Sequence, residues 1–178
     1  MFVFFVCLSV LVNAQKYGNT LGLRFGNGPY RTIGVSFEQR LFKHVTFEGI
    51  FQSDLSRNTL AHGLIKHHHP VLGKRINLYT GAGMSFGIEE SLYKNTADKE
   101  VITTYGNSTL GADLIAGAEL TILGLTLSVD YKPNLNLVGG ENWYQGQVGI
   151  SLRKVLLSDK ELKKKRRKKK RKKRREDR

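Results

Sequence analysis

The segment Leu110–Lys132, LGADLIAGAELTILGLTLSVDYK, alternates between apolar and polar residues on both sides of a short turn. Up to Leu120 the even positions are all Leu or Ala, and from Leu125 onward the odd positions are Leu, Val or Tyr. Because successive side chains of a strand point to opposite faces, each half has one apolar and one polar face. Pairing Leu120 with Leu125 would place both apolar faces on the same side. We therefore predict a long β-hairpin whose arms have about ten residues each, enough to cross a bilayer as tilted strands.

The same alternation recurs along most of the chain, and turn signals such as Gly26-Asn27-Gly28-Pro29 separate the alternating segments. Pro70 and Gly73 are expected to break the chain after the fourth segment, whose facing is left open. The longest connections are predicted at residues 88–108 and 133–142, on the same rim. We predict eight strands, in residues 17–26, 30–41, 45–52, 59–67, 75–87, 110–120, 125–132 and 143–155.

The polar faces of these strands combine glycine with charged side chains of both signs. A soluble eight-stranded barrel has an apolar interior, so alternation alone leaves the direction of the faces open. Glycine and opposite charges suit a narrow interior filled by ion pairs, and aromatic residues near the strand ends suit membrane interfaces. We therefore predict an all-β fold, an eight-stranded antiparallel up-and-down transmembrane β-barrel with a disordered polybasic C-terminal tail. The charges predicted to line its interior are Arg24, Glu38, Glu48, Asp113, Glu119, Asp130, Lys132 and Arg153.

The N-terminus is an apolar segment that ends in small residues. The run Phe2–Val12 fits the apolar part of a secretory signal peptide and is too short to span a bilayer as a helix. We predict cleavage between Ala14 and Gln15; a buried N-terminal strand is the alternative. Cys7 is the single cysteine, so a mature chain would have no disulfide, thiol nucleophile or cysteine-bound metal.

Basic residues are concentrated at the C-terminus, where residues 160–178 contain 15 Lys and Arg against 3 Asp and Glu. Such a run of like charges repels itself into an extended coil. It could bind nucleic acid through counterion release, but it has no aromatic residue for base stacking, and secretion would separate it from cytoplasmic nucleic acid. We expect contact with anionic lipid headgroups or acidic cell-wall groups; a solvated extension without a dedicated partner is the alternative. The residues predicted to bind this anionic surface are Lys163, Lys164, Lys165, Arg166, Arg167, Lys168, Lys169, Lys170, Arg171, Lys172, Lys173, Arg174 and Arg175.

Three segments carry a resemblance to a known family: INLYTGAGMSFG (Ile76–Gly87), LGADLIAGAEL (Leu110–Leu120) and QVGISLRKV (Gln147–Val155). In this glycine-rich alternation the chain resembles the small eight-stranded outer-membrane barrels of the OmpA/OmpX type, particularly the compact versions of Bacteroidota-like bacteria. The resemblance implies a place in the outer membrane of a Gram-negative bacterium, in contact with outer-membrane lipid. It also implies assembly by an outer-membrane insertion machinery that recognises the last strand. Gln147, Gly149 and Leu152 match the pattern that this machinery recognises, whereas Lys154 occupies a position that is usually aromatic.

Residues for catalysis or metal binding do not form a recognisable motif. His67-His68-His69, with His44 and His62 elsewhere, raises the possibility of a metal site, but adjacent strand residues point to opposite faces and no nearby carboxylate completes the set. We interpret the three histidines as an exposed turn at the periplasmic rim and predict no metal or cofactor. The one segment with G-x-S-x-G spacing, Gly83–Gly87, lies within a predicted strand and forms no nucleophile elbow. No other spacing identifies a nucleophile and its base, which favours a protein without catalytic activity.

These features divide the chain into a signal peptide (residues 1–14), a barrel (residues 15–157) and a tail (residues 158–178). We expect the interior charges to form an ion-pair network rather than a proton or ion path, because eight strands enclose an interior just wide enough for side chains. The leading hypothesis is a monomeric, non-enzymatic outer-membrane barrel with a structural or surface-interaction role and a periplasmic tail. The alternatives are a soluble secreted β-barrel that binds an apolar ligand and a barrel enzyme that modifies lipid.

Overall fold

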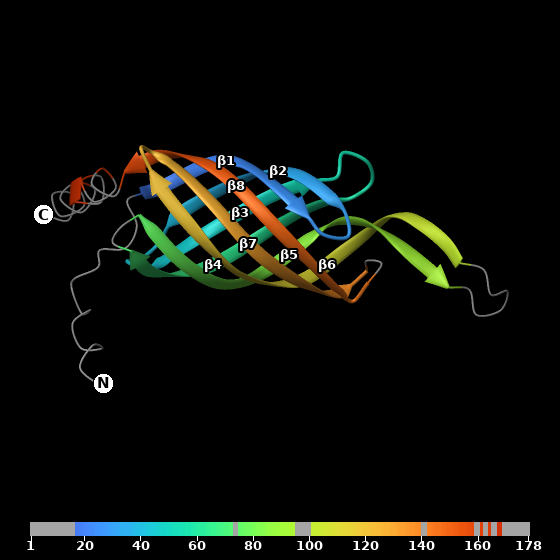
Figure 1. Cartoon of the computed structure of the whole chain (residues 1–178). Coiled ribbons are helices and arrows are strands. Elements are labelled where there is room, and N and C mark those ends of the chain that lie inside the picture. Colours follow the sequence, from blue (N-terminus) through green and yellow to red (C-terminus); the bar gives the residue numbers. More distant parts are fainter. Residues whose placement is uncertain are drawn as a thin grey trace, which may run out of the picture.

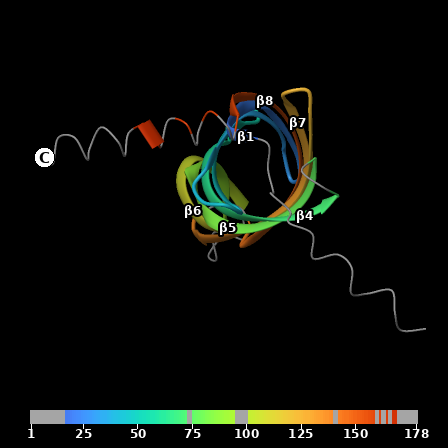
Figure 2. The same ribbon diagram turned by 90° about the vertical axis from the view of Figure 1, so that its left-hand side faces the viewer.

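Eight antiparallel strands run up and down in chain order and close into a barrel through the pairing of β1 with β8 (Figure 1). Figure 2 shows the ring of strands from the end that carries both termini. The predicted eight-stranded antiparallel β-barrel is therefore confirmed. The strands are β1 Tyr17–Asn27, β2 Arg31–Arg40, β3 Val45–Ser53, β4 Thr59–Leu72, β5 Ile76–Lys94, β6 Val101–Ile122, β7 Leu125–Val138 and β8 Tyr144–Ser158.

The structure is a computed structural model that describes residues 17–72, 75–94, 101–139, 142–158, 161, 164, 167 and 168. The predicted signal peptide and its cleavage site at Ala14 and Gln15 lie outside these residues. In the predicted disordered tail, the four described residues from 161 to 168 have helical backbone geometry, and the rest of the tail also lies outside the described part. Within that part of the chain, no helix has the length and apolar character needed to cross a membrane.

The two rims of the barrel differ in what they carry. Tyr17 pairs with Ser158, so the strand that opens the barrel and the strand that closes it meet at one rim, the terminal rim (Figure 1). The connections after β2, β4 and β6 also lie at the terminal rim. Those after β1, β3, β5 and β7 lie at the opposite rim, the loop rim.

Strand β7 shows the arrangement of the two faces most clearly, with exposed and buried residues alternating from Leu125 to Lys132. Thr126 and Ser128 are buried, whereas Leu127 and Val129 are nearly half exposed. Since buried residues of a closed barrel point into it, the polar face is the inner one. Among the described residues, the buried hydrophobic side chains are limited to Ile50, Leu64, Tyr79 and Ile115.

The connection predicted at residues 88–108 is largely strand, and that prediction was wrong. β5 and β6 remain paired out to Lys94 and Val101, although β4 pairs with β5 only as far as Ile88 and β7 with β6 only from Leu110. The resulting two-stranded ribbon projects from the loop rim (Figure 1). A ribbon beyond the barrel has no interior to face, which explains why the period of two that identifies a half-buried strand is missing there.

The predicted ends of the fourth and seventh strands, at residues 67 and 132, were also wrong, because β4 continues through Pro70 to Leu72 and β7 through Pro133 to Val138. The ladder between β4 and β5 shifts register directly after Pro70. Beside Pro133, the ladder between β6 and β7 is interrupted. Proline has no N–H to donate, so it is tolerated where the hydrogen-bond ladder is broken.

The turn between β6 and β7 is a two-residue loop, because Ile122 pairs with Leu125. Both central residues have positive φ, 50° at Leu123 and 83° at Gly124, as in a type I′ turn. Asn adopts this conformation more readily than Leu, so we expect Leu123→Asn to raise the free energy of unfolding by about 1 kcal/mol. Urea unfolding of the refolded barrel measures this change. Gly124→Ala should lower stability in the same assay, and a loss of stability in Leu123→Asn would contradict the interpretation.

Candidate functional site: the charged interior

The interior of the barrel is lined by polar side chains. Among the described residues, 29 polar or charged side chains are buried. All eight charged residues that the sequence predicted for the interior are included, and none is more than 4 % exposed. They belong to three groups along the barrel, one in its middle, one toward the terminal rim and one toward the loop rim.

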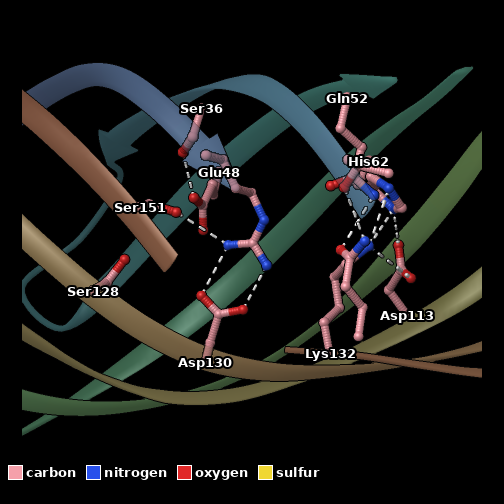
Figure 3. A network of polar contacts seen from close by, with 12 residues as sticks. Ser36, Glu48, Gln52, His62, Asp113, Ser128, Asp130, Lys132 and Ser151 are labelled. Atoms are coloured by element: carbon pink, nitrogen blue, oxygen red, sulfur yellow. Dashed lines mark hydrogen bonds and ion pairs between the residues drawn. The ribbon is translucent and has the colours of Figure 1, made fainter. Parts of the chain in front are cut away.

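The middle group is built on an ion pair between Arg24 of β1 and Asp130 of β7 (Figure 3). The guanidinium donates through Nη1 to Oδ2 at 2.8 Å and through Nη2 to Oδ1 at 2.5 Å. Tyr79 donates its hydroxyl to the same carboxylate at 2.9 Å, and Ser151 accepts a bond from Arg24 at 3.1 Å. Two parallel bonds between a guanidinium and a carboxylate fix both groups in position.

Gly149 makes room for this ion pair. A Cβ atom at Gly149 would lie 2.1 Å from Nη2 of Arg24 and 2.8 Å from Oδ1 of Asp130. Since both groups are buried and hydrogen-bonded, we expect Gly149→Ala to lower the free energy of unfolding by about 1–3 kcal/mol, the usual cost of overpacking. Urea unfolding measures this change, with Gly49→Ala as the matched control, because a Cβ atom at Gly49 would have its nearest neighbour at 3.8 Å, in Phe47. Unchanged stability in Gly149→Ala would show that the guanidinium is free to move aside.

The second group, toward the terminal rim, brings three carboxylates around two cations. Arg153 Nη1 lies 2.7 Å from Glu38 Oε2 and 2.6 Å from Glu48 Oε1, and Nη2 lies 3.7 Å from Glu119 Oε2. Lys66 Nζ lies 3.0 Å from Glu38 Oε2 and 2.7 Å from Glu48 Oε2. All five side chains are essentially buried, so the charges are compensated by one another rather than by bulk water.

His68 completes this group. Its Nε2 atom lies 3.2 Å from Glu38 Oε1, and its Nδ1 atom lies 3.5 Å from Glu119 Oε1. The interpretation of the three histidines as an exposed turn was therefore wrong, since all three lie on β4. His67 and His69 are exposed, as predicted, but His68 is buried beside two carboxylates. The cause is the extension of β4 past His67, which continues the alternation and turns His68 inward.

The same three side chains are candidates for metal ligands. One ligand atom each from Glu38, His68 and Glu119 lies within 4.8 Å of the others, the one such group found among the described residues. However, Arg153 and Lys66 already lie 2.7 Å and 3.0 Å from the Glu38 carboxylate. A metal ion here would be repelled by two cations, so the geometry favours an ion-pair network over a metal site.

The third group lies toward the loop rim and contains His62, Asp113 and Lys132 (Figure 3). Asp113 Oδ2 lies 2.7 Å from His62 Nδ1, and Lys132 Nζ lies 3.0 Å from His62 Nε2. Asn134 donates to Asp113 Oδ1 at 2.8 Å. A histidine that is oriented by an aspartate can act as the base that activates a hydroxyl nucleophile. Here, however, the Nε2 atom of His62, which would take the proton, faces the ammonium group of Lys132.

A small hollow opens beside this group at the loop rim. It holds about 30 Å³ and is lined by His62, Lys132 and Asn134 together with polar side chains of other strands, Gln52 and Gln147 among them. A volume of this size accommodates about one or two water molecules. This hollow, which lies among the described residues, is too small for an apolar ligand.

Sequence reasoning brought together some of these residues and missed others. The sequence predicted that the interior charges form an ion-pair network, and Asp113, Glu119 and Asp130 lie near Lys132, Arg153 and Arg24, respectively. The missed members are His62, Lys66 and His68 of β4 and Tyr79 of β5. The three residues of β4 have even numbers, but Leu60 and Leu64 share this parity, so the alternation gave no clear signal for them.

Comparison with solved structures agrees with this architecture. The crystal structure of the N-terminal β-barrel domain of Pseudomonas aeruginosa OprF is similar to this chain, with a TM-score of 0.57 and 14 % sequence identity. The match covers 78 % of this chain and 99 % of that domain. At this identity the similarity establishes the barrel fold. No protein-family model matches the sequence, and no curated protein gives a significant match, so the relation to Bacteroidota-type barrels stays a prediction.

Proposed function

We propose that the protein is a monomeric, non-enzymatic β-barrel of the outer membrane of a Gram-negative bacterium, with a structural or surface-interaction role. The observation that carries this proposal is the inverted polarity of the barrel. Among the described residues, 29 buried side chains are polar or charged and four are hydrophobic, whereas 32 large hydrophobic side chains are exposed. Similarity of fold to the OprF barrel domain supports the same proposal.

The size of the exposed apolar surface favours a lipid environment. Leu23, Phe86 and Ile150 are examples from three strands, with 51 %, 62 % and 48 % of their surface exposed. Burying one such side chain fully is worth about 1.5–3 kcal/mol, so leaving the whole belt in water would cost on the order of tens of kcal/mol. Monomeric soluble proteins rarely expose an apolar surface of this extent.

Aromatic residues at the loop rim fit an interface between lipid and water. The Tyr131 and Tyr144 hydroxyls lie 2.7 Å apart on the outer surface, and the ring of Trp143 lies 5.8 Å from that of Tyr144. Tyrosine and tryptophan are enriched at this depth because their rings are apolar and their polar atoms reach water. These three aromatic side chains support a boundary between lipid and water just inside the loop rim.

The two alternative functions have weaker support. A soluble barrel that binds an apolar ligand needs an apolar cavity, but the interior contains charged side chains and a hollow of about 30 Å³. A lipid-modifying enzyme needs a nucleophile and base that substrate can reach. Among the described residues, His62 most resembles a catalytic base because it contacts Asp113. It is buried, however, and its other ring nitrogen contacts Lys132, so substrate cannot reach it.

Fractionation of the native host, followed by electrophoresis with and without boiling, tests the proposal. We expect the protein in the outer-membrane fraction, and we expect its mobility to change on boiling because the folded barrel resists detergent at room temperature. Recovery in the soluble periplasm, with identical mobility in both samples, would overturn the proposal.

The polybasic tail gives this barrel a second proposed contact. β8 ends at Ser158 on the terminal rim, which carries the short turns and would face the periplasm. Residues 160–178 hold 15 Lys and Arg, and each basic residue near an anionic surface contributes about 1 kcal/mol. We propose that the tail binds anionic lipid headgroups or acidic cell-wall groups.

We also propose that the outer-membrane insertion machinery recognises β8 through Gln147, Gly149 and Leu152.

Deletion of the chain after Ser158 is expected to leave the barrel folded and to remove salt-sensitive binding to anionic surfaces. Barrels held in neutral-lipid nanodiscs can be mixed with phosphatidylglycerol vesicles or with peptidoglycan, and the bound fraction measured by sedimentation at low and high salt. A variant with the basic residues of 163–175 changed to glutamine controls for tail length. Equal binding of the deleted and full chains at low salt would contradict the role of the tail.

A further inference from the structure

The terminal rim carries three exposed cations, which we call the basic rim. Lys43 lies in the turn between β2 and β3, Arg75 directly precedes β5, and Lys154 lies near the end of β8. In contrast, every carboxylate side chain that the structure describes in residues 17–158 is buried, except that of Asp54 in the loop between β3 and β4, at the loop rim. Within this part of the chain, the exposed charges at the terminal rim are therefore all positive.

Lys154 indicates where the lipid-facing surface ends. It alternates with Leu152 and Leu156 along the outer face of β8, and it pairs with Leu125 of β7 and Leu21 of β1. All four leucines are exposed. A charge on the lipid-facing side of a barrel is costly in the middle of a bilayer and nearly neutral at its interface. Because the apolar stem of lysine can lie along such a surface, its ammonium group can reach the headgroups.

Backbone hydrogen bonds hold two of these cations beside the turn between β6 and β7. The N–H of Val155 donates to the carbonyl of Gly124 at 2.7 Å, which keeps Lys154 next to this turn. The N–H of Thr121 donates to the carbonyl of Arg75 at 2.8 Å. Both cations therefore lie at the level of the short turns of the terminal rim.

The turn between β2 and β3 holds Lys43 at the same rim. Arg40 donates through Nε to the carbonyl of Phe42 at 3.0 Å and through Nη2 to the carbonyl of Lys43 at 2.8 Å. Phe42 is 71 % exposed, and Leu123 in the turn between β6 and β7 is 98 % exposed. Large apolar side chains beside basic ones are typical of segments that lie at the boundary between acyl chains and headgroups.

We propose that Lys43, Arg75 and Lys154 bind the phosphate groups of anionic phospholipids in the leaflet at the terminal rim. Charge complementarity favours this occupant, since three exposed cations attract a phosphodiester. An anionic lipid such as phosphatidylglycerol also lacks the ammonium group that a zwitterionic lipid would bring toward them. The basic rim belongs to the barrel and is separate from the polybasic tail. The inference rests on the proposed function, because a barrel outside a membrane would meet no headgroup.

Electron paramagnetic resonance of spin-labelled lipids in vesicles of phosphatidylcholine and phosphatidylglycerol tests the proposal. Lipid that contacts the barrel is motionally restricted, and the restricted fraction of each labelled lipid gives its relative affinity. The full-length chain carries glutamine in place of the basic residues of 163–175, which removes most of the charge of the tail. At low salt we expect phosphatidylglycerol to be preferred at least about twofold. Each basic residue near the surface is worth about a fivefold preference, which is averaged with boundary positions that lack a cation.

Two triple variants in this background isolate the charge of the basic rim. Lys43→Gln/Arg75→Gln/Lys154→Gln is expected to abolish the preference for phosphatidylglycerol. Lys43→Arg/Arg75→Lys/Lys154→Arg is the matched control, because it changes the same positions and keeps the three charges. It should keep the preference. Heat-dependent mobility in electrophoresis checks that both variants are folded, as expected for substitutions of exposed side chains.

The possible failures give different results. Equal affinity for the two lipids when the basic rim is intact, or an unchanged preference in the glutamine variant, would overturn the proposal. In both cases restricted lipid is still present, so the membrane barrel stands and the headgroup contacts alone are rejected. If neither labelled lipid is restricted by the folded protein, the proposed function fails and this inference fails with it.

Discussion

Replacing Arg153 with methionine is expected to lower the free energy of unfolding by about 3–5 kcal/mol, the cost of removing one partner from a buried ion pair. Arg153 lies within 2.7 Å of both Glu38 and Glu48 and 3.7 Å from Glu119. After the substitution, three buried carboxylates would share Lys66 and the imidazole of His68. The hydrophobic packing of methionine cannot compensate for carboxylates that have lost a cation.

Urea titration of the barrel in phospholipid vesicles, followed by the fluorescence of Trp143, measures this effect, because Trp143 is the single tryptophan of the chain. Lys154→Met is a matched control that removes the next residue of the same strand, which is exposed on the outer face. We expect it to change stability by less than about 0.5 kcal/mol, as is usual for surface substitutions. If Arg153→Met and Lys154→Met had equal effects, the interior network would contribute little to stability.

The second large effect is expected at the pair formed by Arg24 and Asp130. Arg24→Met should lower the free energy of unfolding by about 3–5 kcal/mol, since it leaves the Asp130 carboxylate with the Tyr79 hydroxyl as its remaining strong donor. The double variant Arg24→Met/Asp130→Leu should be much more stable than the sum of the two single variants predicts. Replacing a whole buried ion pair with apolar side chains is often neutral, whereas breaking it is costly.

A double-mutant cycle with these variants, measured by the same urea titration, gives the coupling free energy of the pair. Residues in direct contact typically show 0.5–3 kcal/mol, and the bidentate geometry places this pair at the upper end of that range. A coupling free energy near zero would contradict the interpretation that the ion pair between Arg24 and Asp130 stabilises the barrel.

The architecture of the barrel follows from alternation, because a strand between two different environments carries a period of two. Leu127 and Val129 against Ser128 and Asp130 show this pattern clearly, and the structure places these two sets on opposite faces. Strand β4 shows where the pattern fails. Leu64 is buried inside and Ile65 is exposed outside, so both faces of this strand mix apolar and polar residues. His62, Lys66 and His68 could not be assigned to the interior for that reason.

The ion pairs themselves were less predictable than the faces. Arg24 and Asp130 are 106 residues apart, and their contact depends on how far each strand is staggered relative to the next. The alternation reveals which residues point inward but does not reveal their height in the barrel. The clustering of Glu38, Glu48 and Glu119 around Arg153 could therefore be read only from the structure.

Quenching of tryptophan fluorescence by brominated lipid tests most directly that the apolar face of the barrel meets lipid and the polar face does not. In a Trp143→Phe background, a single tryptophan can be placed on the outer face as Leu127→Trp or Val129→Trp, and inside the barrel as Tyr79→Trp. We predict strong quenching at positions 127 and 129 and weak quenching at position 79, because the last side chain is 1 % exposed inside the barrel. Strong quenching at position 79 with none at positions 127 and 129 would contradict the inverted barrel.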